Sequence, residues 1–311
     1  MNNLISVCIA TYKRPELLEK LLLSLLAQKN IDDYNLEIIV VDNDPNKTAE
    51  AVVKRFSEII ILNPRCTVKY DMQPEKNIAL TRNKTVDLAT GGYLFFIDDD
   101  EYADENCLYH HLKVMNEFDA DVTFGNVIPY FNEISTPSYI KFAQIYYKTN
   151  AEDGKATKYF FTSNTMLSLK KIKKEIINFN PDYGITGGED YEFFLRITDE
   201  SSKFLSAASS IVFEFIPPER SNLKWLVKRV FRTGNNYSRS QIENENNQLK
   251  RSLIKINQFI RGVIQSIISI ILAIVFLSFD QKKSLNWFLK AVSNISKPFA
   301  VFGFYPKEYK K

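Results

Sequence analysis

Four consecutive acidic residues, Asp98, Asp99, Asp100 and Glu101, follow a short apolar run over residues 93–97. An apolar run without polar alternation is typical of a strand covered on both faces, and carboxylates mark the point where such a strand must leave the core. Side chains two residues apart point the same way in an extended chain, so we expect Asp98 and Asp100 to converge while Asp99 faces elsewhere. Two converging carboxylates suit Mg²⁺ or Mn²⁺, although a solvated acidic turn would produce the same pattern.

Polar residues that could line the same site follow two other predicted strands. Thr11 and Tyr12 come directly after the apolar run 4–10, and Asp42 follows the run 36–41. The carboxyl ends of parallel strands meet at one edge of an open α/β sheet, where ligands bind. We therefore expect one crevice to receive polar groups from three strand ends.

A second acidic pair, Glu189 and Asp190, follows Gly187 and Gly188 and opens a predicted helix. Glycines allow the backbone to approach a substrate closely. A carboxylate at a helix start is a candidate general base, because the helix dipole favours its ionised form. The same dipole leaves a structural interpretation open, in which the two acids only complement the charge of the helix end.

The spacing of apolar residues predicts the elements that must position these groups. Strands alternate with helices of ten to fifteen residues, which predicts a parallel, doubly wound α/β sheet. The predicted strands are 4–10, 36–41, 67–70, 93–97, 121–131, 159–169 and 203–215. The predicted helices begin at Pro15, span 48–60 and 77–89, begin again after Gly188 and span 222–234, and a polar linker follows over 235–247. Neither common glycine-rich phosphate loop occurs, which argues against a dinucleotide dehydrogenase or a P-loop enzyme.

The chain of 311 residues has a formal net charge of +3, which combines an acidic body with a basic tail. From Arg220 onward there are 17 Lys and Arg and 4 acidic residues, whereas the first 219 residues hold 23 basic and 33 acidic ones. Such a tail favours an anionic partner surface, either a membrane or a nucleic acid. Three scattered cysteines without CxxC spacing, and an N-terminus without a signal-peptide pattern, predict a body in a reducing, cytoplasmic compartment.

Residues 262–279 form an uncharged apolar segment at the lower length limit for a membrane-spanning helix. Its small and polar residues lie three to four apart and form one stripe: Gly262, Gln265, Ser266, Ser269 and Ala273. A single crossing would place seven lysines outside, against the positive-inside tendency. We therefore expect a helix that lies in the cytoplasmic membrane interface, or a re-entrant pair with residues 286–295; an apolar core helix is the alternative. A nucleic-acid binder would leave this segment without a role, so nucleic acid is not an expected partner.

Five motifs occur in the order typical of one enzyme family: ATYKR at 10–14, VVDND at 40–44, LTRNK at 80–84, FIDDDE at 96–101 and GGEDYEFFLR at 187–196. With them, residues 1–235 resemble a family 2 glycosyltransferase of the GT-A fold, and residues 217–237 are similar to the end of bacterial exopolysaccharide transferases of the succinoglycan type. The resemblance implies a Rossmann-like nucleotide-diphospho-sugar transferase domain, with a mixed sheet flanked by helices. Residues 1–101 would form its nucleotide-binding half and 102–235 its acceptor-binding half. Residues 236–311 would be a helical, basic, membrane-associated extension.

The same resemblance implies roles for individual residues. In this family the donor is a nucleotide-diphosphate sugar, a divalent metal bridges its diphosphate, and the anomeric configuration is inverted. The residues implied to bind the nucleotide sugar are Thr11, Tyr12, Arg14, Asp42, Arg82, Asp98, Asp99 and Arg220. The implied ligands of Mn²⁺ or Mg²⁺ are Asp100 and Asp98. Asp190 is the implied catalytic base. Glu189 is the alternative base, or else a neighbour that orients or binds the acceptor.

Within the implied donor site, Tyr12 would pack near the base, Asp42 would accept a hydrogen bond from it, and Asp98 would hold the ribose. Some of these assignments have alternatives. Arg82 could be an exposed helical arginine, and Arg220 with Arg229 could face lipid head groups instead of the diphosphate. His110 and His111 are interpreted as helix-face residues and not as metal ligands.

The predicted activity is inverting transfer of a sugar from a nucleotide-diphosphate sugar, with a UDP-sugar favoured, to a lipid-linked or other saccharide acceptor. The process would be bacterial surface polysaccharide synthesis. The protein would act at the cytoplasmic face of the inner membrane, as a peripheral or monotopic protein held by its C-terminal helices. A polyprenyl-phosphate sugar synthase of the same fold is one alternative. A non-catalytic membrane scaffold is another, although the intact acids argue against it.

Overall fold

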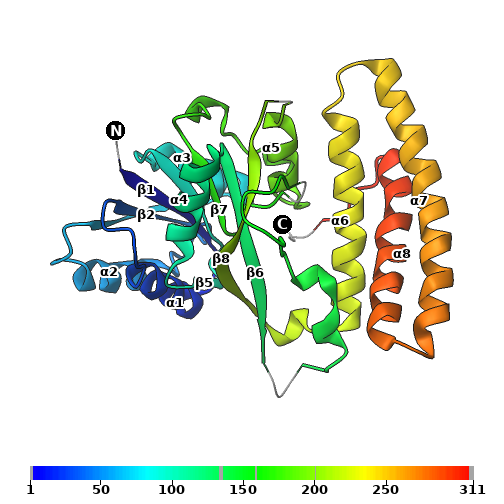
Figure 1. The fold of residues 1–311 in the computed structure, drawn as a ribbon, viewed down its shortest axis with the longest axis horizontal. Helices are drawn as coiled ribbons and strands as arrows, with labels where there is room; N and C mark the ends of the chain where they lie inside the picture. Colours follow the sequence, from blue (N-terminus) through cyan, green and yellow to red (C-terminus); the bar gives the residue numbers. More distant parts are fainter. Residues whose placement is uncertain (1–2, 133–135, 158–159, 200, 308–311) are drawn as a thin grey trace. The chain divides into compact units, whose positions relative to one another are not determined.

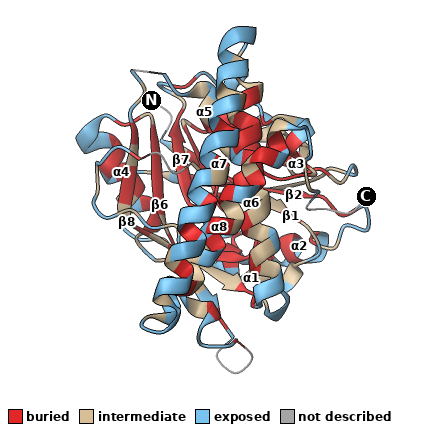
Figure 2. Ribbon diagram, turned by 90° about the vertical axis from the view of Figure 1, so that its right-hand side faces the viewer, coloured by how far each residue is buried: buried red, intermediate tan, exposed pale blue. Residues whose placement is uncertain are grey.

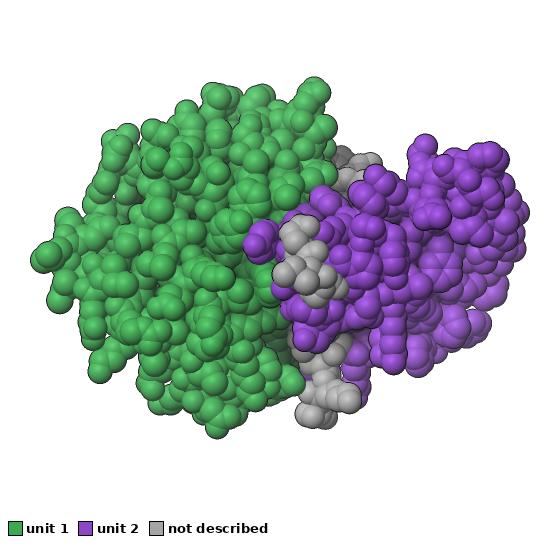
Figure 3. All heavy atoms as spheres, turned by 90° about the horizontal axis from the view of Figure 1, so that it is seen from below, with its two compact units in different colours: residues 1–128, 148–184, 193–215 green, residues 129–147, 185–192, 216–311 purple. Residues whose placement is uncertain are grey.

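The computed structural model of the chain describes residues 3–132, 136–157, 160–199 and 201–307. The chain divides into two compact units, coloured separately in Figure 3. The first unit comprises residues 1–128, 148–184 and 193–215, and the second comprises 129–147, 185–192 and 216–311. Each unit has its own cluster of buried apolar side chains.

The strands form one eight-stranded mixed sheet with the order β3-β2-β1-β4-β7-β6-β8-β5 (Figure 1). Their bounds are β1 Leu4–Thr11, β2 Asn35–Asp42, β3 Cys66–Met72, β4 Tyr93–Phe96, β5 Glu101–Ala103, β6 Val122–Phe131, β7 Thr165–Ser168 and β8 Phe204–Ile216. β1 pairs in parallel with β2 and β4, and β2 pairs in parallel with β3. β7 pairs antiparallel with both β4 and β6. The parallel prediction holds for the first four strands, and the mixed sheet of the GT-A fold is confirmed.

The helices are α1 Pro15–Leu26, α2 Glu50–Ile59, α3 Ile78–Leu88, α4 Cys107–Phe118, α5 Glu189–Ile197, α6 Leu223–Glu243, α7 Gln248–Leu277 and α8 Gln281–Val301. Short 3-10 helices are η1 Ile140–Phe142, η2 Gln144–Tyr146, η3 Lys174–Ile176, η4 Pro181–Tyr183 and η5 Pro218–Arg220. The predicted linker over 235–247 is wrong for most of its length, because α6 continues to Glu243 and buries the polar side chains of Asn235 and Asn236. The predicted strand 159–169 is reduced to β7, and residue 159 lies outside the described residues.

Local sequence explains the elements that position the strand ends of the first unit. Pro15 lies in the first turn of α1, where its missing N–H costs nothing, and the leucines of that helix pack into the core at helical spacing. Asn77 caps α3 by accepting hydrogen bonds from the N–H groups of Ala79 and Leu80. All four residues of β4 are buried, as predicted for a strand covered on both faces. The parallel register brings the ends of β1, β2 and β3 to one edge of this core, where Thr11, Asp42 and Met72 are partners.

In the second unit α8 packs against both α6 and α7, so that the three helices lie side by side (Figure 1). Of the described helices, α7 alone is long and apolar enough to cross a membrane. Its buried residues are Gln258, Gly262, Ser266, Ser269 and Ala273. Its isoleucines are exposed along most of the helix, and much of the α7 ribbon has the colour of exposed residues in Figure 2. Apart from exposed Gln265, the predicted small and polar stripe is thus the packed face of α7, and its apolar face is bare.

Candidate active site

The carboxyl end of β1 carries the first predicted site residues. Thr11 is the last residue of β1 and lies in register with Asp42 at the end of β2. The Thr11 Oγ1 hydroxyl donates a hydrogen bond of 2.9 Å to Asp99 Oδ2, and the Tyr12 N–H donates one of 3.2 Å to the same oxygen. The structure therefore brings the Thr11-Tyr12 segment and the acidic run together, as the parallel arrangement of the strands predicts.

Arg14 joins two of the acids. Its Nη1 atom lies 2.7 Å from Asp99 Oδ1 and 2.7 Å from Asp100 Oδ2, and both carboxylates are buried. The expectation that Asp98 and Asp100 converge while Asp99 faces elsewhere is not met by these contacts. β4 ends at Phe96 and residues 99–100 lie in a turn, so the two-residue alternation of an extended chain no longer applies.

Asp98 pairs with a different arginine. Arg82 Nη2 lies 3.0 Å from Asp98 Oδ1, and the guanidinium also lies over the ring of Phe179 at 5.9 Å. Arg82 is buried, so the alternative of an exposed helical arginine is wrong. Burial is the largest single influence on the pKa of Asp98 and raises it, but the charge and hydrogen bond of Arg82 and the charges of Lys148 and Arg14 together outweigh burial and lower the pKa. Asp98 therefore remains ionised beside a fixed cation.

The pKa of Asp99 moves in the opposite direction. Burial raises it to about 6, and the negative charge of Asp100 acts in the same sense, while the Arg14 guanidinium and the Thr11 hydroxyl act against this rise. The ionised form of Asp99 consequently depends on Arg14 for its counter-charge.

Glu101 is a member of the acidic run to which the sequence assigned no role. It is buried, accepts a hydrogen bond of 3.0 Å from the Asp98 N–H at Oε2, and accepts another at Oε1 from the Ser163 hydroxyl. Burial and the charge of Asp98 raise the pKa of Glu101 well above its ordinary value. The Glu101 carboxyl thus holds the backbone at Asp98, where the acidic turn begins. Its sequence signal is only its place in the run, which does not distinguish a buried acid from a solvated one.

The Asp42 carboxylate accepts its hydrogen bonds from other groups of the protein. Its Oδ1 accepts from the N–H of Asp44 at 2.9 Å, and its Oδ2 accepts from the N–H of Ala49 at 2.8 Å and from the Tyr70 hydroxyl at 3.2 Å. The side chain is fully buried. Asp42 therefore shapes the loop between β2 and α2, and a nucleotide base would have to share an oxygen that already accepts a hydrogen bond.

The two histidines after the acidic run lie on α4. His111 is buried and hydrogen-bonds Thr123 Oγ1 at 2.8 Å and Asn164 Oδ1 at 2.9 Å through its two ring nitrogens. Burial lowers its pKa to about 4. His110 is only partly exposed on the same helix. His111 is therefore a neutral core residue whose ring nitrogens are both occupied by protein groups.

The second acidic pair belongs to the second unit. Gly187 and Gly188 have φ angles of +77° and +90°, a conformation that favours glycine, and α5 begins directly afterwards. Asp190 is half-buried and its Oδ1 accepts a hydrogen bond of 2.7 Å from the Tyr191 N–H, whereas Glu189 is buried. The glycine turn and the acidic helix start are thus as the sequence predicts.

Arg220 and Arg229 also belong to the second unit, in η5 and α6. The Tyr146 hydroxyl donates a hydrogen bond of 2.6 Å to the carbonyl oxygen of Arg220, and the Tyr146 ring stacks on Trp225 at 5.8 Å. The backbone at Arg220 is therefore anchored by an aromatic pair.

The acids at the end of β4 fit a divalent cation that takes few ligands from protein. Among residues 3–132, 136–157, 160–199 and 201–307, no three His, Cys, Asp or Glu side chains are grouped to hold a metal by themselves. Mg²⁺ and Mn²⁺ commonly use one or two carboxylates and complete their shell with phosphate oxygens and water. Asp100 and Asp98 carry hard oxygen donors of that kind, and a cation bound there would replace or share their present contacts with Arg14 and Arg82.

Comparison with known proteins places these features in a family. The family model described as Glycosyl transferase family 2 matches residues 6–176. The succinoglycan biosynthesis protein ExoM of Rhizobium meliloti is 28% identical over 235 residues, which cover 76% of this chain and 74% of that protein. An uncharacterized glycosyltransferase of Methanocaldococcus jannaschii is 27% identical over 248 residues, which cover 73% of this chain and 75% of that protein.

Solved structures with the same fold are more distant in sequence. A mannosyltransferase from Pyrobaculum calidifontis, in complex with GDP-Man and Mn²⁺, has a TM-score of 0.59 at 14% identity and covers 96% of this chain and 87% of its own. S. aureus TarS in complex with UDP has a TM-score of 0.51 at 13% identity, with coverage of 96% of this chain and 90% of that one. At such low identity the likeness concerns the fold.

Proposed function

The chain belongs to glycosyl transferase family 2 and is a glycosyltransferase of polysaccharide synthesis, and we propose a specific reaction for it. In this reaction it transfers a sugar from a nucleotide-diphosphate sugar to a lipid-linked saccharide, with inversion of the anomeric configuration. The observation that carries the proposal is the set of carboxylates and arginines at the ends of β1 and β4: Asp98, Asp99 and Asp100 with Arg14 and Arg82. The structural neighbours hold UDP, UDP-GlcNAc or GDP-Man, and a UDP-sugar is the donor that we favour.

In this proposal the ends of β1 and β2 receive the nucleoside. Thr11 and Tyr12 line the base pocket, Asp42 supports it, and Asp98 accepts from the ribose hydroxyls. Arg14 and Arg82 provide positive charge beside the acids, so that a diphosphate would not face carboxylates alone. Asp100 and Asp98 would hold Mn²⁺ or Mg²⁺, which would neutralise the charge that develops on the leaving diphosphate.

The reacting groups follow from an inverting displacement. Asp190 accepts the proton of the acceptor hydroxyl, whose oxygen forms a bond to the anomeric carbon as the bond from that carbon to the diphosphate breaks. The nucleoside diphosphate leaves with the bonding electrons. Glu189 orients the acceptor, and Arg220 pairs with the departing diphosphate. These assignments rest on the position of Asp190 in the first turn of α5, directly after the Gly187–Gly188 turn.

The assignment of Asp190 is tested by two conservative variants. Asp190→Asn should lower kcat by about 10²–10⁴ while the affinity for the donor stays nearly unchanged, since the base touches the acceptor. Glu189→Gln should change acceptor KM more than kcat. The donor is first chosen by thermal shift with UDP-, GDP- and dTDP-sugars in the presence of MnCl₂. The opposite pattern in the two variants would make Glu189 the base.

The proposal also includes attachment to the cytoplasmic face of the membrane through the helical extension, residues 236–311, while residues 1–235 carry the transferase. The support is the polarity of α7, which packs its small residues on α8 and leaves isoleucines bare. Ser266 Oγ donates a hydrogen bond of 3.0 Å to the Ala291 carbonyl, and Gly262 lies so close to α8 that a Cβ would be 2.6 Å from Pro298 Cδ. Small residues between helices and apolar residues outside are typical of helices in lipid.

Membrane attachment is tested by flotation with vesicles that contain anionic lipid. Replacing Ile267 and Ile271 of α7, which are 54% and 56% exposed, by lysine should abolish co-flotation. Lysines at Ile61 and Leu62, which are 78% and 92% exposed after α2 in the first unit, add the same charge and are the matched control. If both double variants float equally well, the bare face of α7 is not the lipid-binding surface.

The acceptor class separates the proposal from its alternatives. Transfer to polyprenyl phosphate alone would identify a polyprenyl-phosphate sugar synthase, whereas transfer only to a polyprenyl-diphosphate-linked saccharide supports the proposed activity. A protein that binds vesicles but releases no nucleotide with either lipid would be a scaffold.

A further inference from the structure

The loop before the proposed base is fastened to a single helix far away in the sequence. Asn236 of α6 donates through Nδ2 to the Gly187 carbonyl at 2.7 Å and to the Thr186 carbonyl at 3.3 Å. Asn236 is 5% exposed, and these loop residues lie with it in the second unit. Because one side-chain amide binds two successive backbone carbonyls, it restricts both the position and the orientation of the Thr186–Gly188 turn relative to α6.

The close approach requires glycine at position 188. A Cβ at Gly188 would lie 2.9 Å from Asn236 Cβ, and the residue has a φ of +90°. Both the space and the conformation therefore exclude a larger side chain without movement of the turn. The GlyGly pair in the sequence is explained by this contact with α6 as well as by any contact with a substrate.

Arg239 is the second link, one turn further along α6. Its Nη1 donates to the Thr186 hydroxyl at 3.2 Å, while its Nε bonds the Glu243 carboxylate at 2.9 and 3.0 Å. The guanidinium lies 4.4 Å from the ring centroid of Tyr305 and is largely buried. An arginine held by an acid and a ring has little freedom, so it presents a fixed donor to Thr186.

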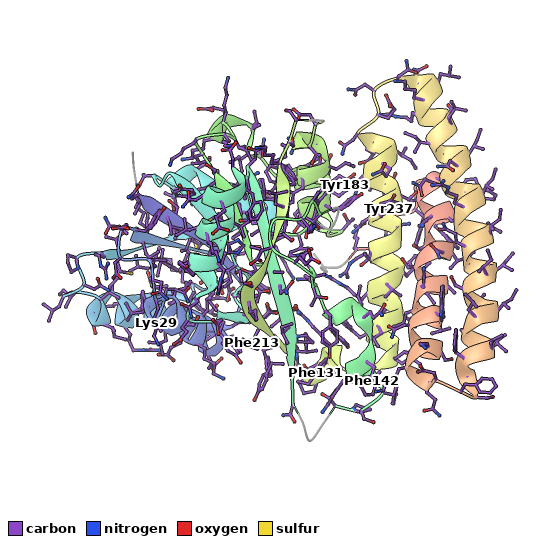
Figure 4. All side chains as sticks on the ribbon, in the orientation of Figure 1. Lys29, Phe131, Phe142, Tyr183, Phe213 and Tyr237 are labelled. Atoms are coloured by element: carbon purple, nitrogen blue, oxygen red, sulfur yellow. The ribbon has the colours of Figure 1, made fainter. Side chains whose placement is uncertain are left out.

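Aromatic contacts connect the same helix to the residue after Asp190. The rings of Tyr191 and Tyr237 are 5.5 Å apart, and Gln241 Nε2 donates to the Tyr191 hydroxyl at 3.2 Å. Figure 4 labels Tyr237 on α6. The turn before Asp190 and the residue after it are thus both held by α6.

We propose that Asn236 and Arg239 are positioning residues for the reaction: they hold the Thr186–Gly188 turn on α6 and so set the place of the Asp190 carboxylate. This inference rests on the proposed role of Asp190 as general base. Neither residue touches a reacting atom. A displacement of about 1 Å at a catalytic group can cost about 10²-fold in rate, so loss of the amide should be visible in kcat.

The chain provides a matched control one residue away. Asn235 is also buried and also donates through Nδ2 to two backbone carbonyls, those of Ser296 at 3.2 Å and Phe304 at 2.9 Å, and both of these carbonyls lie outside the Thr186–Gly188 turn. Asn235→Ala and Asn236→Ala therefore remove the same chemical group and the same number of hydrogen bonds. Their losses of folding stability should be similar.

The first measurement uses no substrate. Amide hydrogen exchange on the full chain should be about tenfold faster over residues 187–191 in Asn236→Ala, and unchanged there in Asn235→Ala. Arg239→Lys retains the positive charge but loses the fork that joins Glu243 and Thr186, and it should accelerate the same residues. If these residues exchange at the wild-type rate in both Asn236→Ala and Arg239→Lys, the inference is overturned.

The second measurement is kinetic, with the nucleotide sugar that the wild-type protein turns over and a polyprenyl-diphosphate-linked saccharide. Asn236→Ala should lower kcat by about 10–100-fold with little change in donor affinity, whereas Asn235→Ala should keep kcat within about twofold. In the double variant with Asp190→Asn, the Asn236→Ala loss should disappear, because a misplaced base matters only where a base is present.

Two results distinguish a wrong assignment of the base from a wrong assignment of the positioning residues. If Asp190→Asn retains the wild-type kcat, the assignment of the base fails. If Asp190→Asn is slow but the Asn236→Ala loss is absent, or adds fully to it in the double variant, the base stands and the positioning role is wrong.

Discussion

Replacing Arg14 by leucine removes the counter-charge of two buried carboxylates at once. Its Nη1 lies 2.7 Å from an oxygen of each of Asp99 and Asp100, which are 5% and 7% exposed. Removing one partner of a buried ion pair typically costs about 3–5 kcal/mol. Because the Arg14 side chain is itself 31% exposed, we expect the lower end, about 3 kcal/mol in the free energy of unfolding. That corresponds to a fall in Tm of about 6–12 °C.

The loss should depend on pH in a defined direction. In the wild type the folded pKa of Asp99 is already raised to about 6, and losing the Arg14 charge, which lowers it, raises it further above the unfolded value. A carboxyl with a raised folded pKa stabilises the fold while it is protonated, and this contribution is lost as the pH rises through that pKa. The deficit of Arg14→Leu relative to the wild type should therefore be larger at pH 8 than at pH 5.

Urea denaturation at both pH values measures the effect, and Arg65→Leu is the control. Arg65 Nη1 also pairs with an aspartate, Asp32 Oδ1 at 3.0 Å, but this pair lies on the surface with the two side chains 52% and 85% exposed. The control should lose less than about 1 kcal/mol at either pH. Equal losses for the two variants, or an Arg14→Leu deficit that does not shrink at pH 5, would refute the ion pairs of Arg14 with Asp99 and Asp100 as the source of stability.

Two further outcomes follow from buried groups in the first unit. Gly91→Ala should destabilise the fold by about 1–3 kcal/mol in urea denaturation without changing nucleotide affinity, because its Cβ would lie 2.5 Å from the Leu4 carbonyl oxygen and 2.7 Å from Ser6 Oγ; wild-type stability would contradict this packing. His111 is neutral in the folded protein with a pKa of about 4, so unfolding should become easier as the pH falls from about 6.5 to 4, by on the order of 3 kcal/mol. His111→Gln should flatten this acid dependence and His110→Gln should not, and an unchanged slope in the first variant would show that other groups cause it.

The sequence predicted the elements whose pattern is local. Unbroken apolar runs identified β1, β2 and β4, because a strand buried on both faces needs apolar residues at successive positions. Leucines at helical spacing identified α1, because a helix buried on one face needs apolar residues three or four positions apart. The linker predicted over 235–247 was wrong, because polar residues can be buried when distant segments supply their hydrogen-bond partners. Asn235 and Asn236 are polar and therefore predict a loop. In the structure they are buried in α6, and their side-chain amides donate hydrogen bonds to the backbone carbonyls of Ser296 and Gly187.

The candidate site was predicted in its composition but not in its pairing. The resemblance and the strand ends indicated Arg14, Arg82 and the three aspartates, and the structure places all of them in two adjacent ion-paired groups. Which acid meets which arginine depends on the turn at residues 99–100, whose direction the residue types alone leave open. The raised pKa of Glu101 likewise depends on burial and on the charges of Asp98 and Glu214, which the residue types alone do not reveal.

By itself, then, the sequence determined the family, the parallel half of the sheet and the residue types at the strand ends, because these depend on patterns within a few residues of each other. Tertiary structure alone decided the contacts between distant segments. It placed Asn236 on the Gly187 carbonyl across 49 residues, and it turned the small stripe of α7 towards α8 and its isoleucines outward. A helix pattern states that two faces differ in polarity, but which face is packed depends on the surface that the neighbouring helix offers.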